Sequence, residues 1–210
     1  DVLKHGVEFD NGVSLTLMYR KPATTFNPKA EALYQQNVLS VMEEVWHKEG
    51  ERIDLVIFLN GIAIFTFELK CNTSGQNYED AIRQYKFERD YKTRLLKFKA
   101  GCLAHFAMDL NEVYMCTNLK GKSSFFLPFN KGCGVGIHSG KGNPHNENGI
   151  NVSYMWEDIL KKDTVLYLID KIIFLQKETK KDPDTGKRVT KETLIFPRYH
   201  QFNAVRKLVA

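Results

Sequence analysis

The 210-residue chain lacks an apolar run that is long enough to cross a membrane. Its longest uncharged apolar stretch, residues 55–67, has thirteen residues, whereas a membrane-spanning helix needs about 20. The first residues also lack the basic and then apolar pattern of a signal peptide. We therefore expect a protein with no membrane partner and a cytoplasmic location.

The four cysteines lack the C-x-x-C spacing that is typical of structural zinc sites. Because nothing in the sequence indicates secretion, we expect reduced thiols. Cys133, His138 and His145 match no known pattern of metal ligands, so we interpret them as loop residues.

A G-x-x-x-x-G-K-[ST] phosphate-binding loop is also missing. The glycine-rich segment 131–149 has neither the strand-to-helix context nor the GK[ST] ending of such a loop. ATP binding is therefore not expected within this sequence. No internal repeat is visible, and 43% hydrophobic and 26% charged residues indicate an ordinary globular domain.

The net charge of +5 is unevenly distributed. Residues 161–210 hold 12 basic and 6 acidic residues, so residues 1–160 sum to −1. A second basic run, residues 83–99, has seven positive and two negative side chains. Basic stretches are typical of proteins with a polyanionic partner, although a lysine-rich helix face is more often only solvated.

Hydrophobic periodicity predicts an α/β domain with a central mixed sheet. Asp182-Pro183 and the residues around them predict an exposed turn or linker over residues 177–193. The expected elements are a hairpin over 7–19, a helix over 27–50, strands over 53–59 and 62–69, a long basic helix over 75–98, strands over 102–107, 112–118 and 124–129, and helices over 153–175.

Three charged residues bracket the two apolar strands at 53–59 and 62–69. Asp54 lies near the start of the first strand, and Glu68 and Lys70 lie at the end of the second. Carboxylates at the ends of buried strands are costly unless they are paired or bind a metal. Because side chains alternate along a strand, Glu68 and Lys70 share one face.

The register of this hairpin decides whether Asp54 joins Glu68. A two-residue turn at Asn60-Gly61 would pair position 54 with position 67 and place the two carboxylates on opposite faces. A three-residue loop, Asn60-Gly61-Ile62, would pair position 54 with position 68. We predict this second register, or a bulge of equal effect.

Such a carboxylate pair, together with the carbonyl oxygen of Leu69, would suit Mg²⁺. The cation would polarise a phosphodiester and lower the pKa of an attacking water. Lys70 would orient that water or stabilise negative charge on the phosphate. The alternative is an Asp54–Lys70 salt bridge that caps a buried hairpin.

The sequence IDLVIFLNGIAIFTFELK at residues 53–70 resembles the motor-and-nuclease (R) subunit of type I restriction enzymes. Asp54, Glu68 and Lys70 match its PD-(D/E)xK nuclease motif, although Ile53 stands where the motif name has proline. The resemblance covers nearly the whole chain and continues through EDAIRQYKFERD, EVYMCTNLKGKSSFFLPFNKG, GKGNP and LIFPRYHQFNAVRKLVA. It implies an α/β PD-(D/E)xK restriction-endonuclease-like core with a central mixed sheet flanked by helices.

The resemblance also implies roles for single residues. Asp54, Glu68 and the Leu69 carbonyl would bind the metal, and Lys70 would be the catalytic lysine. Gln84 matches the Gln of a Q-x-x-x-Y motif and is a further catalytic candidate. The position four residues on is Glu88 and the nearby tyrosines are Tyr85 and Tyr91, which leaves the tyrosine role open.

The helix that follows the motif would also supply contacts to DNA. Basic side chains on it would touch phosphate groups and position DNA without reading its sequence. The residues concerned are Arg83, Lys86, Arg89 and Arg94.

The end of the chain is similar to the entry of the family's helicase-like motor. We expect a nuclease domain over residues 1–176, a charged linker over 177–193 and the truncated start of a motor domain over 194–210. Gln201 matches the Gln of a Q-motif that reads adenine, and a helix-capping Gln is the alternative.

The function that the resemblance implies is a type I site-specific deoxyribonuclease. It would hydrolyse phosphodiester bonds with Mg²⁺, or Mn²⁺, after ATP-driven translocation by a motor, and ATP would bind only the full-length protein. Its partners would be double-stranded DNA and the modification and specificity subunits. Two alternatives stay open: a catalytically silent DNA-binding or assembly module of the same fold, and a stand-alone nuclease of the repair or resolvase type.

Overall fold

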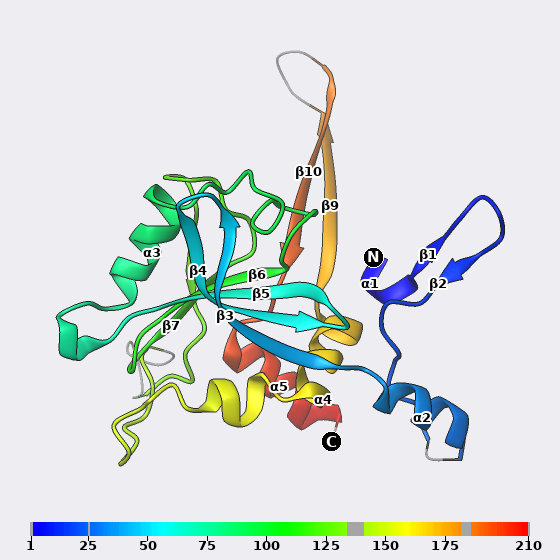
Figure 1. The fold of residues 1–210 in the computed structure, drawn as a ribbon, viewed down its shortest axis with the longest axis horizontal. Helices are drawn as coiled ribbons and strands as arrows, with labels where there is room; N and C mark the ends of the chain where they lie inside the picture. The colour runs from blue at the N-terminus through cyan, green and yellow to red at the C-terminus, as the bar shows by residue number, and fades with distance from the viewer. Residues whose placement is uncertain (1, 25, 134–140, 182–185, 210) are drawn as a thin grey trace.

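A six-stranded mixed sheet forms the centre of the protein in the computed structural model, which describes all residues except 1, 25, 134–140, 182–185 and 210 (Figure 1). Strands β5 and β6 pair in parallel, and the other neighbouring pairs are antiparallel. The expected mixed α/β architecture is therefore confirmed. In sheet order the strands are β3 Leu39–Lys48, β4 Glu51–Leu59, β5 Ile62–Leu69, β6 Ala104–Met108, β7 Val113–Cys116 and β8 Leu127–Pro128.

Helices cover both faces of this sheet. Helix α3 (Tyr78–Phe87) packs on one face, and the helical segments after Asn151 pack on the other together with α5 (Tyr199–Val209). The remaining helical elements are α1 Val2–His5, α2 Pro28–Gln35, η1 Asn72–Ser74, η3 Met155–Ile159, α4 Lys162–Tyr167 and η4 Leu168–Ile172. Among the residues that the structure describes, no helix is long and apolar enough to cross a membrane.

Each face of the sheet has its own apolar core. The larger core is rich in aromatic rings: Phe65, Phe106, Phe129 and Phe196 are buried there, and their ring centroids lie 5.7–6.0 Å apart in edge-to-face pairs. The smaller core lies under α3. The candidate carboxylates are on the strands between these two cores.

The helix expected over residues 27–50 is wrong in its second half. Asn27 caps α2 as expected, but α2 ends at Gln35 and residues 39–48 form the edge strand β3. Val41 and Val45 are β-branched, and β3 pairs with β4 over most of its length. β-Branched residues fit a pleated, half-buried surface, so strand pairing prevails over the helical spacing.

The long basic helix expected over residues 75–98 is also wrong in length. Helix α3 begins with a capping box made by Asn77 and Asp80 and ends at Phe87, with Glu88 as its C-cap. The residues that follow form turns instead. The shorter helix matters for the site because it changes where Arg89 points.

The linker expected over residues 177–193 is a β-hairpin. Strands β9 (Phe174–Lys181) and β10 (Arg188–Ile195) pair antiparallel as a separate two-stranded sheet. Residues 182–185, where the sequence predicts a turn, lie outside the described residues. After the hairpin, Phe196 and Phe202 are buried in the larger core, so the segment that contains them packs with the first part of the chain. The assignment of residues 194–210 to a following motor domain stays a prediction.

Other expected elements are found with shifted ends. The N-terminal hairpin is reduced to β1 (Val7–Glu8) and β2 (Ser14–Leu15). The strand expected over 124–129 contributes only two residues to the sheet, and the helices expected over 153–175 end at Ile172.

Candidate functional site

The candidate site is built on the β4–β5 hairpin. Leu59 pairs with Ile62, so the turn contains only Asn60 and Gly61. Both turn residues have a positive φ, of 50° and 80°, which is the conformation that an Asn-Gly hairpin turn requires. The three-residue loop that we expected is therefore wrong.

A β-bulge restores the expected side-chain arrangement. The register shifts after Phe58, so that Ile57 pairs with Phe65 and Ile64 is the extra residue. Leu55 consequently pairs with Phe67. The next residues toward the open end of the hairpin, Asp54 and Glu68, therefore lie opposite each other. The bulge of equal effect is confirmed.

Asp54 closes the open end of the hairpin. Its Oδ2 accepts a hydrogen bond of 2.7 Å from the backbone N–H of Leu69. The backbone N–H of Lys70 donates to the carbonyl of Met108 on β6 at 2.9 Å. Within the described part of the chain, the Lys70 ammonium has no hydrogen bond or ion pair, so the alternative Asp54–Lys70 salt bridge is absent.

Glu68 is fully buried and pairs with a guanidinium. Its Oε1 lies 2.7 Å from Nε of Arg89, and its Oε2 lies 3.4 Å from Nη2. Burial raises the pKa of Glu68 to about 8; Arg89 acts to lower this pKa, and the adjacent Asp54 carboxylate acts to raise it. Two acidic groups and one fixed cation thus share this end of the hairpin.

Arg89 differs from its expected role as a surface contact to DNA. Its side chain is only 10% exposed and its charge is directed at Glu68. The surface prediction failed because it placed Arg89 on a continuing helix, whereas α3 ends two residues earlier.

The turn after α3 holds Arg89 in place, and sequence reasoning missed the residues that fix it. The backbone N–H of Asp90 donates to Glu51 at 2.7 Å, and the Asp90 carboxylate lies 3.2 Å from the Lys48 ammonium. Nδ1 of His47 lies 3.0 Å from the hydroxyl of Thr93. These contacts tie the turn to the β3–β4 hairpin, and no local pattern in the sequence indicates them.

The residues considered for the Q-x-x-x-Y motif, on α3 and at its C-cap, lie in different environments. The Oε1 atom of Gln84 is buried and has no hydrogen-bond partner among the described residues. Tyr85 is fully buried, and its hydroxyl lies 2.8 Å from Thr66 in the smaller core. Glu88 instead lies 3.7 Å from the exposed Arg83. Tyr85 is thus a core residue, and Gln84 stays a candidate.

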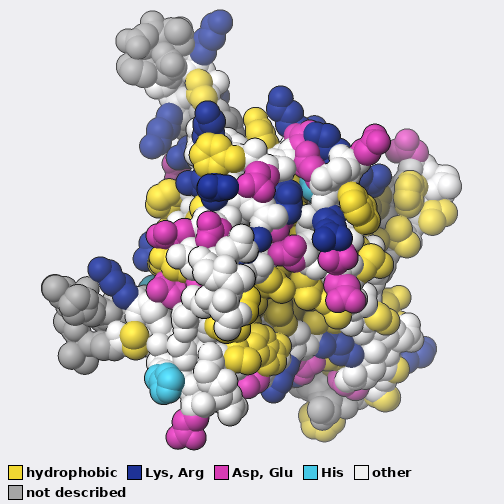
Figure 2. All heavy atoms as spheres, turned by 60° about the vertical axis from the view of Figure 1, so that its left-hand side comes forward, with side chains coloured by type: hydrophobic (Ala, Val, Ile, Leu, Met, Phe, Trp, Pro, Cys, Tyr) yellow, Lys and Arg dark blue, Asp and Glu magenta, His cyan; other side chains and the backbone are white. Residues whose placement is uncertain are grey.

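The other predicted DNA contacts are on a surface of mixed charge. Arg83 and Arg94 are exposed, and Lys86 is half-buried. Figure 2 shows Lys and Arg side chains interspersed with Asp and Glu over the face that carries α3. The DNA contacts of these three residues stay a prediction.

Gln201 caps its own helix. Its Oε1 accepts a hydrogen bond of 2.9 Å from the backbone N–H of Arg198, at the start of α5. This is the alternative that the sequence left open, and nucleotide binding by Gln201 stays a prediction.

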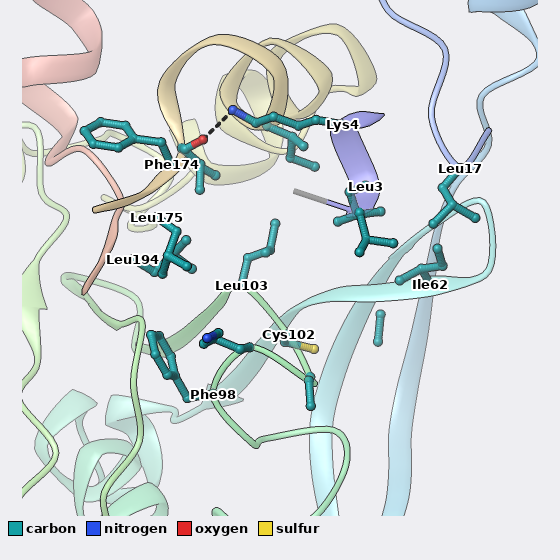
Figure 3. Close-up of a pocket in the computed structure, with 17 residues that line it drawn as sticks. Leu3, Lys4, Leu17, Ile62, Phe98, Cys102, Leu103, Phe174, Leu175 and Leu194 are labelled. Carbon is teal, nitrogen blue, oxygen red and sulfur yellow. Dashed lines mark hydrogen bonds between the residues drawn. The ribbon is translucent and has the colours of Figure 1, made fainter. Parts of the chain in front are cut away.

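An apolar cavity of about 480 Å³ lies away from these residues. Leu3, Leu17, Leu103 and Leu194 point into it, and Lys4 donates a hydrogen bond of 2.6 Å to the carbonyl of Ile173 at its edge (Figure 3). None of the predicted site residues lines this cavity, so the cavity is separate from the carboxylate pair.

The described residues contain no group of three or more His, Cys, Asp or Glu side chains that could hold a metal. Any cation at the hairpin would therefore depend on two carboxylates with neutral oxygen ligands or water. His138, considered above with Cys133 and His145, lies outside the described residues.

Comparison with known proteins assigns the chain to a family. The sequence model of the type I restriction enzyme R protein N terminus matches residues 18–124, which include the whole carboxylate hairpin and α3. A protein of Methanocaldococcus jannaschii named "Putative type I restriction enzyme MjaVIIIP endonuclease subunit" is 26% identical over 213 residues. That alignment covers 94% of this chain but only 17% of the relative. The chain belongs to the family of type I restriction enzyme R protein N termini.

Proposed function

We propose that this chain is the metal-dependent DNA endonuclease domain of a type I restriction enzyme, with a PD-(D/E)xK core. The observation that carries the proposal is the placement of Asp54 beside Glu68 by the bulged hairpin, with an unpaired Lys70 ammonium two residues further on. The family assignment and the endonuclease name of the relative support it.

The residues present fit a divalent cation. Two adjacent carboxylates are ligands that Mg²⁺ prefers, and the guanidinium on Glu68 indicates that this position already accommodates positive charge. Asp54, Glu68 and the Leu69 carbonyl would hold the ion, and the buried, unpartnered Oε1 of Gln84 is a further oxygen on the covering helix. When bound, Mg²⁺ or Mn²⁺ would polarise the phosphodiester and lower the pKa of the attacking water.

The protein's own groups have separate tasks in this proposal. Asp54 and Glu68 fix the position of the cation. Lys70 donates hydrogen bonds to the attacking water or to a phosphate oxygen, because an ammonium without another partner is available for such contacts. Arg89 keeps the Glu68 carboxylate in one orientation through its two-point contact.

The activity of the whole enzyme is part of the same proposal. The chain spans about a sixth of the length of its relative, so a motor would lie elsewhere in the full-length protein and would bind ATP there. Double-stranded DNA and the modification and specificity subunits are the proposed partners. The site of action would be cytoplasmic.

Substitutions in the complete restriction complex test the proposal. Asp54→Asn keeps an acceptor for the Leu69 N–H, and Lys70→Met keeps the side-chain length. Each is expected to abolish DNA cleavage while ATP hydrolysis continues at the wild-type rate. Glu8→Gln, on the exposed strand β1, is the matched control and should cleave normally. Normal cleavage by either site variant would overturn the proposal.

A silent DNA-binding or assembly module is the second candidate, and the Glu68–Arg89 ion pair favours it. A carboxylate that is neutralised from within the protein has less affinity for an external cation. Calorimetric titration with Mg²⁺ and Mn²⁺ separates the two candidates. Saturable binding that Glu68→Gln removes supports the nuclease, whereas the absence of binding in the wild-type complex supports the silent module.

A further inference from the structure

We infer that the β9–β10 ribbon is an arm that binds the phosphate backbone of double-stranded DNA. The inference rests on the proposed function only in taking DNA as the substrate. The ribbon contributes no residue to the carboxylate site, and neither the family match, which ends at residue 124, nor the predicted contacts on α3 include it.

The ribbon is a separate structural unit. Its eight consecutive residue pairs join Phe174 with Ile195 at the base and Lys181 with Arg188 at the outer end. It extends away from the central sheet (Figure 1), and most of its side chains are exposed. An isolated two-stranded ribbon is only marginally stable in water, so a bound partner would stabilise it.

The charges of the ribbon favour an anionic partner. Glu192 is already paired with Lys99 and, at 3.4 Å, with Lys177. Glu178 is paired with Lys180 at 3.8 Å. The two acidic side chains of the strands are thus neutralised by lysines, and the remaining basic groups determine the charge that the ribbon presents.

Three basic side chains of the strands have no ion-pair partner among the described residues: Lys181, Arg188 and Lys191. Lys181 and Arg188 face each other directly across the two strands. Like charges in this position destabilise a β-ribbon, and phosphate groups would remove that repulsion. Figure 2 shows Lys and Arg side chains gathered along the ribbon at the upper left.

The shape and surface of the ribbon fit DNA better than they fit an apolar protein surface. Val189 and Phe174 are its two exposed large hydrophobic side chains, and Phe174 lies at the base. A two-stranded ribbon is narrow enough to enter the major groove. Lysine and arginine contacts to phosphate would fix the register of the protein on DNA without specifying its sequence.

Salt-dependent binding to a labelled 30-base-pair duplex tests the inference in the full-length protein. The variant carries Lys181→Ser, Arg188→Ser and Lys191→Ser together. Each lost phosphate contact lowers the slope of log affinity against log salt by about 0.9, so the slope should decrease by about 2.7. A variant with Lys181→Arg, Arg188→Lys and Lys191→Arg should keep the wild-type slope.

The matched control removes three exposed lysines elsewhere: Lys29→Ser, Lys161→Ser and Lys207→Ser. It changes the net charge equally and should leave the slope within about 0.5 of wild type, because generic charge effects are small beside direct phosphate contacts. Circular dichroism should show that both triple variants are folded. The inference is overturned if the ribbon variant binds with the slope of the control.

Failure of the ribbon inference can be distinguished from failure of the proposed nuclease function. Asp54→Asn concerns cleavage and should bind DNA with the wild-type slope. If Asp54→Asn abolishes cleavage and the ribbon variant binds normally, the nuclease assignment stands and the ribbon assignment fails.

Discussion

Glu68 is the most constrained single residue, because a buried carboxylate beside a second carboxylate needs either a cation or a proton. Arg89 is that cation in the structure. Sequence reasoning could single out Asp54, Glu68 and Lys70 as candidates, because charged residues at the ends of apolar strands are conspicuous. It could not find the partner of Glu68, because Arg89 reaches the site from a turn that is fixed by long-range contacts.

Removing the charge of Arg89 should destabilise the protein. In Arg89→Met, measured at pH 7 without divalent cations, Glu68 loses its compensating charge and must be buried either ionised or with a bound proton, so the free energy of unfolding should fall by about 3 kcal/mol. Urea unfolding followed by circular dichroism measures this loss. Arg52→Met is the control, because Arg52 pairs with Glu44 on the surface and should cost less than about 1 kcal/mol. Equal losses in the two variants would contradict a structural role for the buried pair.

His105 should make stability depend on pH. Burial lowers its pKa to about 3, whereas an unfolded histidine has a pKa of about 6.5. Protons therefore bind preferentially to the unfolded state below pH 6.5, and stability is lost as the pH falls. Between pH 7 and pH 5 His105 should contribute a loss of about 2 kcal/mol, which the raised pKa of Glu68 opposes over the same range.

Urea unfolding at both pH values measures the His105 contribution. His105→Asn retains a group that can bond with Thr66, which lies 2.8 Å from Nδ1 of His105, and its change in stability between the two pH values should be more favourable than that of wild type by about 2 kcal/mol. His200→Asn, on the exposed side of α5, should behave as wild type. A loss that persists unchanged in His105→Asn would assign it to other groups.

At the scale of secondary-structure elements, the β4–β5 hairpin determines where the candidate carboxylates lie. Its strands were predictable because both are apolar runs joined by Asn-Gly. The bulge at Ile64 was predictable only as a requirement of the carboxylate chemistry, since no residue preference marks its position. Strand β3 and the end of α3 were not predictable, because in both segments tertiary pairing prevails over local helical spacing.

The turn of this hairpin should tolerate few residues. Gly61 has a φ of 80°, so Gly61→Ala should lower the free energy of unfolding by about 1 kcal/mol or more. Gly61→Asn should cost less, because Asn adopts the left-handed conformation more readily. Thermal unfolding of the two variants provides the comparison. If both substitutions cost the same, the backbone conformation is not the cause.

At the scale of the whole molecule, the segment after β10 packs against the rest of the protein. Phe196 lies against Phe65, Phe106 and Phe129, and a bidentate ion pair joins Arg206 to Asp158 with both N···O distances at 2.7 Å. The sequence could not reveal this packing, because composition alone made residues 177–193 resemble a linker. These contacts join residues that lie far apart in the sequence, as in the pair of Phe196 with Phe65.

Truncation after residue 176 should therefore prevent stable folding, and Phe196→Ala should cost about 3–5 kcal/mol. Phe125→Ala, at a side chain that is 74% exposed, should change stability by less than about 0.5 kcal/mol. Calorimetric melting of the three variants measures these effects. An unchanged melting temperature after truncation would show that residues 194–210 belong to another unit.

The β4–β5 hairpin also has a consequence for the order in which the chain folds. The contact between Asp54 and Leu69 spans 15 positions, whereas the contact of Asp90 with Glu51, which seats the Arg89 turn, spans 39. Hairpins close in microseconds, and longer crossovers follow more slowly. We expect the two carboxylates to meet before the guanidinium arrives, so the early hairpin carries an electrostatic repulsion that only the completed β5–α3–β6 crossover relieves.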